Sequence, residues 1–446
     1  MAETRYPLLQ SHVPEAVFAF WQGQPITTGQ FLQHVQHVAS ALPEAPHAIN
    51  LCEDRYLFLV SFVALLLRGQ VNLLPPNRAP RVVEAVAADY PGSYCVVDAA
   101  LAELELAQHE VTLTGTAPAE ALSLPLWLPA GQVAATVFTS GSTGQARANV
   151  KRWGELYLGA QLTAAAFALQ QREPLAVVAT VPPQHMFGLE TSVILPLATG
   201  LAVHGGRPFF PDDLRRTLAG LDATALLITT PVHLRACVDA GLDWPALGGI
   251  ISATAPLAAE TAQRAEALFA CTVHEIYGST ETGAIATRRT ARESQWRLHS
   301  GLSLQQRDGT VLVSGGHLAE AVQLNDSLNL AADGSFSLLG RDSDMIKIAG
   351  KRASLGDLNH KLLSIPGIKD GVFVVPDTGA EQTSRLMALV VAPQLDNRAI
   401  LAALQERIDP VYLPRPIYRV DRLPRNDTGK LPREALQALL TTLRNH

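Results

Sequence analysis

The chain has 446 residues, of which 48% are hydrophobic and 17% charged, so it can form two or three domains with a large core and is too apolar to be disordered. The formal net charge is −6, and no basic segment is interleaved with aromatic residues, which argues against nucleic-acid binding. The four cysteines are scattered without Cys-x-x-Cys spacing, which argues against a zinc site or a disulfide framework and favours a reducing, cytoplasmic location.

The first 113 residues alternate amphipathic helices with short apolar strands. The N-terminus has no basic flank followed by an apolar stretch, so no signal peptide is expected. Residues 57–67 form the longest apolar run. Because this run is too short to span a bilayer as a helix, it predicts a buried core helix. A helix is expected over 82–90, a strand over 94–98 and a surface connection over 114–127.

From residue 133 to about 283, strand-like runs alternate with helical patterns, which predicts an α/β fold whose sheet is covered by helices. The expected buried strands are 176–182, 200–204, 224–229, 248–252 and 271–276. Between 297 and 340, short strands separated by Asp-Gly turns predict a β-rich subdomain. Residues 344–446 are numerous enough for a separate small domain.

A loop of small residues follows the apolar run 134–138 and reads Thr139-Ser140-Gly141-Ser142-Thr143-Gly144. Its glycines and hydroxyl groups favour a loop whose backbone N–H groups and hydroxyls close around a phosphate. It is not a Walker loop, because Gly-x-x-x-x-Gly-Lys does not occur in the chain. Taken alone, such a loop is also typical of a plain turn.

Three further motifs follow in order. The first is Tyr277-Gly278-Ser279-Thr280-Glu281-Thr282-Gly283, expected as a polar turn after strand 271–276. The others span residues 340–352, beginning Gly340-Arg341, and 423–433, which includes Gly429-Lys430. Together with the first loop, they resemble the motifs of the AMP-forming adenylating enzymes: acyl- and aryl-CoA synthetases, luciferases and nonribosomal-peptide adenylation domains. The resemblance runs from about residue 50 to the C-terminus.

The resemblance implies an α/β fold in two domains. The large N-terminal domain, residues 1–341, would comprise sheet-and-helix subdomains plus a β-rich subdomain, and residues 342–446 would form a small, mobile α+β lid carrying the catalytic lysine. The implied activity is ATP-dependent activation of a carboxylic acid to acyl-AMP with release of pyrophosphate. The acyl group would then pass to the phosphopantetheine thiol of an acyl carrier protein or of CoA. ATP and Mg²⁺ are the implied cofactors.

By the same resemblance, residues 139–144 would grip the pyrophosphate end of ATP. The family usually continues Gly-x-Pro-Lys, whereas this chain has Gly144-Gln145-Ala146-Arg147, which keeps the charge and loses the proline. Thr143 and Glu281 would hold Mg²⁺, which proteins commonly bind through one or two carboxylates together with phosphate oxygens and waters. The alternative for Glu281 is a solvated loop acid.

The adenosine would be held by residues from several motifs. Tyr277 would stack on adenine, and the Asp326 carboxylate would accept hydrogen bonds from the ribose hydroxyls, although Leu324-Asn325-Asp326 replaces the usual Thr-Gly-Asp. A plain loop aspartate is the alternative for Asp326. The residues expected around the nucleoside and its α-phosphate are Ala253, Thr254, Tyr277, Gly278, Ser279, Thr280, Asp326 and Arg341.

Two more residues are implied in catalysis. Lys430 would reach the junction of the carboxylate and the α-phosphate, where a long flexible ammonium can neutralise charge in the transition state. His185 would border the acyl pocket and gate access to it, and 229–231 would form another wall. The alternatives are a solvated lysine and a satisfied core histidine.

For the second half-reaction, Lys351 and Arg352 resemble the segment that lines the pantetheine tunnel after the lid has rotated, and Ser343 occupies the hinge position. The compact chain favours a carrier protein slightly over CoA by analogy. The acid can be aryl or fatty. Two other hypotheses remain: an acyl-AMP ligase with an amine or hydroxyl acceptor, and a non-catalytic relative that binds nucleotide or acyl ligand. Intact Glu281 and Lys430 argue against the second of these.

Overall fold

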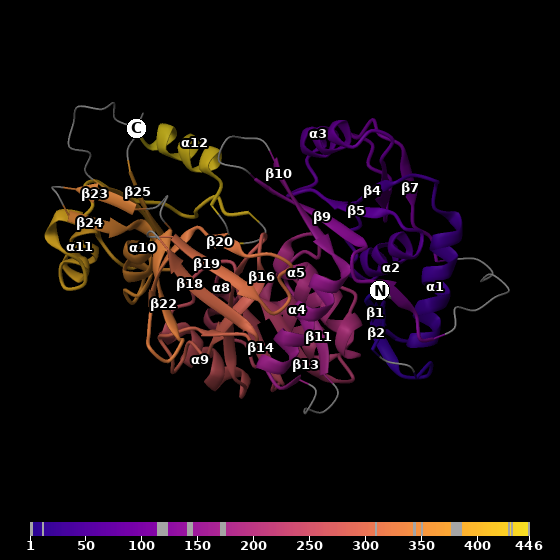
Figure 1. The fold of residues 1–446 in the computed structure, drawn as a ribbon. Helices are drawn as coiled ribbons and strands as arrows, with labels where there is room; N and C mark the ends of the chain where they lie inside the picture. The colour runs from indigo at the N-terminus through magenta and orange to yellow at the C-terminus, as the bar shows by residue number, and fades with distance from the viewer. Residues whose placement is uncertain are drawn as a thin grey trace.

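The computed structural model of the chain contains two large sheets, each covered by helices, and several small sheets that are mostly antiparallel (Figure 1). No helix among the described residues is both long and apolar enough to cross a membrane. The side chains of Ser140, Ala146, Arg341, Met345, Lys347, Arg352, His360, Arg433 and Arg444 are not described. The described residues are 3–10, 13–113, 124–140, 146–169, 175–307, 310–341, 345–348, 351–375, 386–426, 429 and 431–444.

The largest sheet has nine strands, and its six central strands run parallel. Antiparallel strands close both edges. Its parallel strands are rich in buried Val, Ile, Leu and Ala, as expected of a sheet covered on both faces. In spatial order the strands are β17 (Arg297–Leu298), β16 (Gly283–Arg288), β15 (Val273–Ser279), β14 (Gly249–Ser252), β13 (Thr224–Thr229), β11 (Leu175–Ala179), β12 (Ala202–His204), β2 (Val17–Trp21) and β3 (Gln24–Thr27).

The second sheet has six strands, five of them parallel. The sixth, β10, pairs antiparallel with β9 at one edge, so the chain reverses after β9. Their order is β10 (Ala146–Arg152), β9 (Val133–Ser140), β5 (Val71–Leu74), β4 (His47–Asn50), β6 (Tyr94–Val97) and β7 (Gln108–Glu110).

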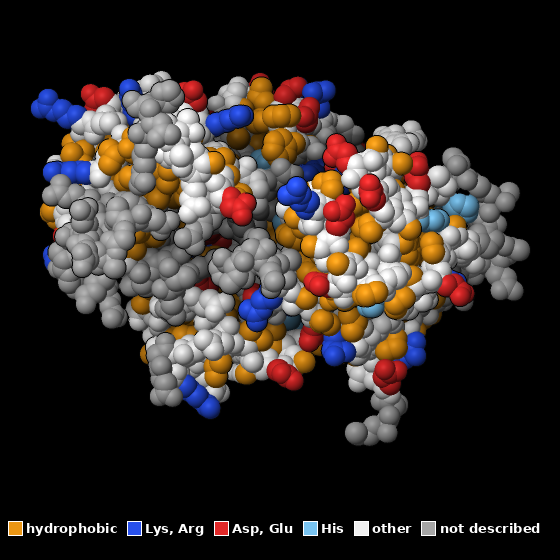
Figure 2. Space-filling view, turned by 90° about the horizontal axis from the view of Figure 1, so that it is seen from above, with side chains coloured by type: hydrophobic (Ala, Val, Ile, Leu, Met, Phe, Trp, Pro, Cys, Tyr) orange, Lys and Arg blue, Asp and Glu red, His pale blue; other side chains and the backbone are white. Residues whose placement is uncertain are grey.

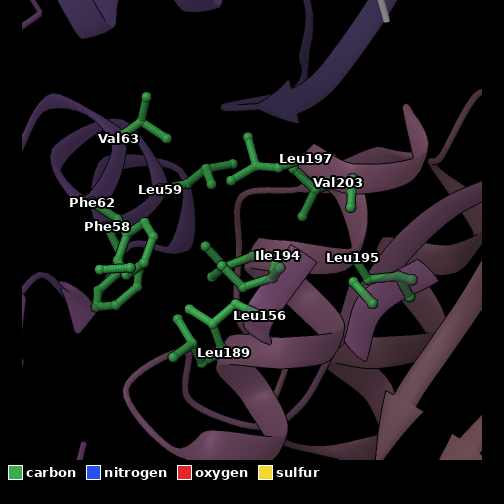
Figure 3. Packing of buried hydrophobic residues seen from close by; sticks show 14 of the residues in the cluster. Phe58, Leu59, Phe62, Val63, Leu156, Leu189, Ile194, Leu195, Leu197 and Val203 are labelled. Atoms are coloured by element: carbon green, nitrogen blue, oxygen red, sulfur yellow. The ribbon is translucent and has the colours of Figure 1, made fainter. Parts of the chain in front are cut away.

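Helix α2 (Arg55–Leu67) lies in the core between the two sheets. It is apolar on every face, which suits a fully enclosed helix. It begins where the Asp54 side chain accepts a hydrogen bond from Leu57 N, and it ends before Gly69, whose φ of +69° turns the chain. Figure 3 shows Phe58 and Phe62 of α2 facing Ile194 and Leu156 from the other side of the core.

Helices also cover the outer faces of the sheets and surround the segment that carries His185. Glu190–Ile194 is a π-helical turn inserted between two short helices, and π turns occur often at functional sites. The remaining helices are α1 (Thr28–Ala41), α3 (Pro80–Asp89), α4 (Trp153–Ala166), α5 (Met186–Leu189), η2 (Glu190–Ile194), α6 (Leu195–Thr199), α7 (Pro211–Ala219), α8 (Pro231–Asp239), α9 (Ala259–Phe269), α10 (Leu355–Leu363), α11 (Asn397–Gln405), η4 (Pro410–Tyr412) and α12 (Arg433–Arg444).

The small sheets belong mostly to the last third of the chain. Those after residue 345, with α10, α11 and α12, enclose their own apolar clusters and lie at one end of the molecule (Figure 1). The strands are β1 (Arg5–Pro7), β8 (Trp127–Pro129), β18 (Leu302–Arg307), β19 (Thr310–Gly315), β20 (Val322–Leu324), β21 (Asp326–Leu330), β22 (Phe336–Arg341), β23 (Met345–Ile348), β24 (Lys351–Ser354), β25 (Asp370–Val374), β26 (Met387–Val391) and β27 (Ile417–Arg419).

The predicted α/β architecture is confirmed, with a buried helix over the long apolar run and strands near the expected positions. One expectation was wrong: β15 continues through Ser279, so Tyr277–Ser279 is strand and the turn begins at Thr280. The antiparallel partner β16 extends it. Residues 114–123 and 342–344 lie outside the described residues, and the predicted domain boundary after 341 stays a prediction. Acidic and basic side chains are intermixed on the face seen in Figure 2.

Candidate active site

The two strands that flank the predicted phosphate loop lie next to the Glu281 turn. Strand β9 carries Thr139 and ends at Ser140, and β10 returns antiparallel with Arg147 opposite Thr139. The Arg147 guanidinium lies 3.9 Å from the Glu281 carboxylate. Gly141, Ser142, Thr143 and Gly144 lie outside the described residues. Two motifs that are far apart in the sequence therefore contribute side chains to one place.

The Glu281 turn joins β15 to β16, and its geometry depends on two glycines. A Cβ on Gly278 would overlap the carbonyl oxygen of Gly283, and Gly283 itself has a φ of +67°. The Thr282 hydroxyl accepts a hydrogen bond from Ser279 N at 3.0 Å and lies 2.8 Å from the Gly283 carbonyl oxygen. The Glu281 side chain takes no part in these local bonds. It is 27% exposed and points towards Arg147.

Three buried or partly buried side chains contact the backbone of this turn, and no motif predicted them. Lys151 Nζ donates to the Glu281 carbonyl oxygen at 2.9 Å. His317 Nε2 donates to the Thr282 carbonyl oxygen at 2.7 Å. The Glu190 carboxyl accepts from Ala284 N at 3.2 Å. A cavity of about 220 Å³ opens beside them, lined in part by Lys151, Glu155, Glu190, Glu281, His317 and Glu320.

Burial shifts the titration of all three side chains. It lowers the pKa of Lys151, although the charges of Glu190, Glu155 and Glu281 oppose that shift. Burial raises the pKa of Glu190 to about 7, against the opposing charge of Lys151. Burial also lowers the pKa of His317, which favours a neutral ring whose proton is on Nε2, because the Thr282 carbonyl can only accept.

Two of the predicted adenosine residues are bonded to each other. The Tyr277 hydroxyl donates to the Asp326 carboxylate at 2.8 Å, and the Tyr277 ring packs beside Trp296 and Phe336. Asp326, at the start of β21, lies opposite Arg341 of β22 in the strand register. Tyr277, Asp326 and the Arg341 backbone are thus brought together, with Gly278 and Ser279 following on β15 and Thr280 in the turn.

The segment that carries His185 is held by a buried arginine that sequence reasoning missed. His185 is partly buried at the start of α5. The Arg55 guanidinium donates to the carbonyl oxygens of Ala179 and Val181 at 3.0 and 2.6 Å and to Ser192 of the π turn. Burial lowers the Arg55 pKa to about 9. Arg55 thus fixes both ends of the chain segment around His185.

The carboxyl ends of β13 and β14 supply the other predicted walls. Thr229 is buried, and its hydroxyl lies 3.0 Å from that of Thr180. Thr230 caps α8 by accepting a hydrogen bond from His233 N. Beyond β14, Ala253 is buried and Thr254 has a φ of +81°, a conformation uncommon for a threonine. Strained backbone of this kind clusters at functional sites.

Lys430 and Ser343 lie outside the described residues, whereas Gly429, directly before Lys430, is described. A Cβ placed on Gly429 would lie 3.3 Å from Val232 Cγ2 and 3.8 Å from the Thr230 hydroxyl. Gly429 is therefore next to the predicted wall of the acid pocket. The Arg425 guanidinium donates to the Gly429 carbonyl at 2.8 Å and, through two further nitrogens, to both Asp370 carboxylate oxygens at 2.7 Å.

Lys351 is placed differently from the expectation of a loop residue. It begins β24, and its ammonium pairs with Asp409 at 2.5 Å. This pairing raises the pKa of Lys351 and lowers that of Asp409. Arg352 follows on the same strand.

The side chains near the Glu281 turn suit a Mg²⁺ ion that is held mainly by the phosphates of a bound nucleotide. Among the described residues, no cluster of three or more His, Cys, Asp or Glu side chains could cage a metal ion. Mg²⁺ usually keeps several waters and takes one or two carboxylates plus substrate phosphates. Glu281, partly exposed beside Arg147 of β10, offers such a carboxylate.

Comparison with known proteins gives two family matches and a structural match over nearly the whole chain. The profile of the AMP-binding enzymes matches residues 10–307, and that of the AMP-binding enzyme C-terminal domain matches residues 359–430. A 4-coumarate–CoA ligase of Cereibacter sphaeroides is 27% identical over 304 residues, 66% of this chain and 69% of that protein. A plipastatin synthase component of Bacillus subtilis is 34% identical over 119 residues, 26% of this chain and 3% of that protein.

Among solved structures, the O-succinylbenzoate coenzyme A synthetase of Bacillus subtilis, in complex with ATP and magnesium ion, matches with a TM-score of 0.81. The two chains share 18% identity, and the match covers 97% of this chain and 100% of the other. At this identity, the likeness establishes the fold: a large N-terminal domain and a small C-terminal domain.

Proposed function

The chain belongs to the family of AMP-binding enzymes, and from that premise we propose which of its residues serve each half-reaction of an AMP-forming acid–thiol ligase. In the first half-reaction, a carboxylate oxygen of the acid attacks the α-phosphorus of ATP, the bond to the bridging oxygen breaks, and pyrophosphate leaves. In the second, a thiol sulfur attacks the acyl carbon, the bond to AMP breaks, and the thioester forms.

The observation that carries the assignment is the approach of Arg147 to Glu281 at 3.9 Å, which joins the phosphate loop to the acidic turn. We assign residues 139–144 and Arg147 to the triphosphate, because backbone N–H groups, hydroxyls and a guanidinium are the groups that bind phosphate. Glu281 and Thr143 would hold Mg²⁺. When bound, that ion would neutralise phosphate charge and orient the oxygens of the leaving group.

We assign the adenosine to the surface around Tyr277 and Asp326. Their 2.8 Å hydrogen bond supports a common role, because it orients the carboxylate beside the aromatic ring. The Asp326 carboxylate would accept a hydrogen bond from a ribose hydroxyl, and Arg341, opposite Asp326 in the strand register, would add positive charge for the ribose or the α-phosphate. Ala253 and Thr254 would separate the adenine from the acyl group.

We assign the acid to the space bounded by His185 and 229–231, with Lys430 at the reacting atoms. Gly429 lies beside Val232 and Thr230 and directly precedes Lys430 in the sequence, which supports this assignment. A lysine ammonium there would neutralise the charge that builds up between carboxylate and α-phosphate. His185 would border the entrance for the acid.

For the second half-reaction, we propose a phosphopantetheine thiol as acceptor, on a carrier protein in preference to CoA. The small domain, residues 342–446, would rotate about Ser343 so that Lys351 and Arg352 line the path of the pantetheine arm. A thiol needs little activation near neutral pH. We further propose a cytoplasmic location, where ATP is available and the four free cysteines stay reduced.

Pyrophosphate release from ATP across a panel of aryl and fatty acids tests the first half-reaction. The expected result is pyrophosphate and AMP only when Mg²⁺ and an accepted acid are both present. Release of ADP and phosphate would refute the assignment. Mass spectrometry of reactions with CoA and with a phosphopantetheinylated carrier protein then tests the acceptor, and transfer to CoA alone would reverse the stated preference.

A further inference from the structure

Three side chains from separate parts of the fold converge on the backbone of one turn. Lys151 comes from β10, Glu190 from the π turn and His317 from the connection between β19 and β20. Their hydrogen bonds go to the Glu281 carbonyl, Ala284 N and the Thr282 carbonyl. A hairpin turn does not need such contacts to close, because the Ser279–Thr282 bonds already close this one.

Two glycines lie beside the Glu190 and His317 side chains, and one of them has no room for a Cβ. A Cβ on Gly283 would overlap the Glu190 carboxyl oxygen. A Cβ on Gly159 of α4 would lie 3.5 Å from the His317 ring and 3.8 Å from Glu190 Oε1. Two glycines on different elements thus border the same side chains. Glu190, His317 and the two glycines therefore pack together around the turn.

Burial of Lys151 at this position carries a desolvation penalty. The residue is only 6% exposed, and an ammonium taken out of water costs more than a well-packed apolar side chain of similar size. Its hydrogen bond to a neutral carbonyl and the nearby carboxylates offset part of that cost. Fold stability alone therefore gives a poor account of a lysine here, and a role in positioning the turn gives a better one.

Lys151 also connects the turn to β10, the strand that follows the predicted phosphate loop in the sequence. Residues four apart in a strand lie on the same face, so Arg147 and Lys151 both project from β10 towards Glu281. Arg147 approaches the carboxylate and Lys151 holds the carbonyl of the same residue. A shift of β10 would therefore move both the phosphate-binding strand and the acidic side chain together.

We propose that Lys151, Glu190 and His317 are positioning residues that hold the Glu281 turn in place against β10, so that the Glu281 carboxylate is preorganised for the Mg²⁺ of the bound nucleotide. The inference rests on the proposed function, in which Glu281 is the metal-binding carboxylate. None of the three touches the reacting atoms; each acts through the backbone of the turn. Preorganisation of this kind depends on residues behind the site whose own conformations are fixed.

The test measures the affinity of Mn²⁺, used as a probe for Mg²⁺, by electron paramagnetic resonance. The full chain is saturated with α,β-methylene-ATP, and no acid substrate is present. We expect Lys151→Met and His317→Leu each to weaken Mn²⁺ binding about tenfold, equivalent to about 1.4 kcal/mol. His317→Gln keeps an N–H donor and should restore most of the affinity. In pyrophosphate release, the same variants should raise the Mg²⁺ requirement while leaving the KM of the acid nearly unchanged.

Two controls separate this proposal from the proposed function. Lys361→Met removes an exposed lysine that pairs with Asp357 on α10, and it should bind Mn²⁺ as the unmodified chain does. Glu281→Gln should weaken binding at least as much as Lys151→Met. If Glu281→Gln weakens binding and Lys151→Met and His317→Leu do not, the positioning role is wrong and the metal role of Glu281 stands.

Two other outcomes are equally decisive. If Glu281→Gln binds Mn²⁺ normally, the metal role itself is wrong, and the positioning role falls with it. If His317→Gln is as weak as His317→Leu, the hydrogen bond to Thr282 does not carry the effect, which would also overturn the proposal. Thermal unfolding of each variant identifies any loss that merely follows from destabilisation.

Discussion

Arg425 should control the adenylation half-reaction although it is five residues away from the predicted catalytic lysine. Its guanidinium binds both oxygens of Asp370 at 2.7 Å and the Gly429 carbonyl at 2.8 Å, so it holds the chain directly before Lys430. Arg425→Met removes all three hydrogen bonds. Arg425→Lys supplies a single ammonium that cannot reproduce the planar, bidentate geometry, so it should also fail, to a smaller extent.

The size of the effect follows from the contacts. Arg425 and Asp370 are 19% and 20% exposed, so the bidentate pair is worth more than a surface ion pair and less than a fully buried one. We expect Arg425→Met to destabilise the C-terminal part by about 1–3 kcal/mol. A misplacement of about 1 Å at a reacting group can cost about 10²-fold in rate. The loss cannot exceed that of removing the Lys430 ammonium itself, about 10²- to 10³-fold.

The assay compares two rates on one preparation: pyrophosphate release with the accepted acid, and thioester formation from supplied acyl-AMP. Only the first should fall. Arg419→Met is the matched control, because Arg419 lies on β27 of the same small sheet as Asp370 and donates to the Leu395 carbonyl. Arg425→Met with pyrophosphate release within twofold of normal would show that other contacts place the Lys430 loop, and the reasoning would be refuted.

Three further results are expected. Lys430→Ala should slow pyrophosphate release by about 10²- to 10³-fold and spare transfer from supplied acyl-AMP, and equal losses in both rates would remove its assigned role. Burial raises the pKa of Glu190 to about 7, so between about pH 4.5 and 7 this carboxyl binds more protons in the native than in the unfolded state. Its contribution to the free energy of unfolding should therefore fall as pH rises through that window. Parallel curves of urea-unfolding stability against pH for the unmodified chain and Glu190→Gln would contradict this. Gly188→Ala would press a Cβ onto the Pro182 carbonyl and should cost about 1–3 kcal/mol in urea unfolding, whereas Gly131→Ala, with open space around it, should cost little; equal effects would exclude steric overlap as the cause.

The large-scale fold was predictable because many of its strands are short apolar runs that alternate with helical patterns. The expected strand 224–229 coincides with β13, and the run 57–67 lies within α2. β10 was not predicted, since Ala146–Arg152 has three basic residues and its alternation is inverted: the polar Asn149 and Lys151 are buried, whereas Val150 is exposed. It forms because it pairs along its whole length with β9. The π turn at Glu190–Ile194 likewise has no signature in the local sequence.

The candidate site was likewise predictable only in part. Motif order predicted a shared site for Arg147, Glu281, Tyr277 and Asp326, and the structure brings these residues together in two pairs. Lys151 belongs to no motif that sequence reasoning singled out, and its role depends on where its side chain ends after folding. The contact to the Glu281 carbonyl is a tertiary property. A buried lysine in a strand is a signal only once its burial is known.

The way each half of the site is held suits a reaction in two steps. Glu281 is fixed by Lys151 and His317, which belong to the same large part of the chain as the phosphate loop. Gly429, directly before Lys430, accepts a hydrogen bond from Arg425, which is paired with Asp370, and all of these residues belong to the C-terminal part. If that part rotates after adenylation, the contacts of Arg425 with Asp370 and Gly429 travel with it. Lys430 would then leave the α-phosphate as a preformed unit, while the turn that carries Glu281 stays in place for the next ATP.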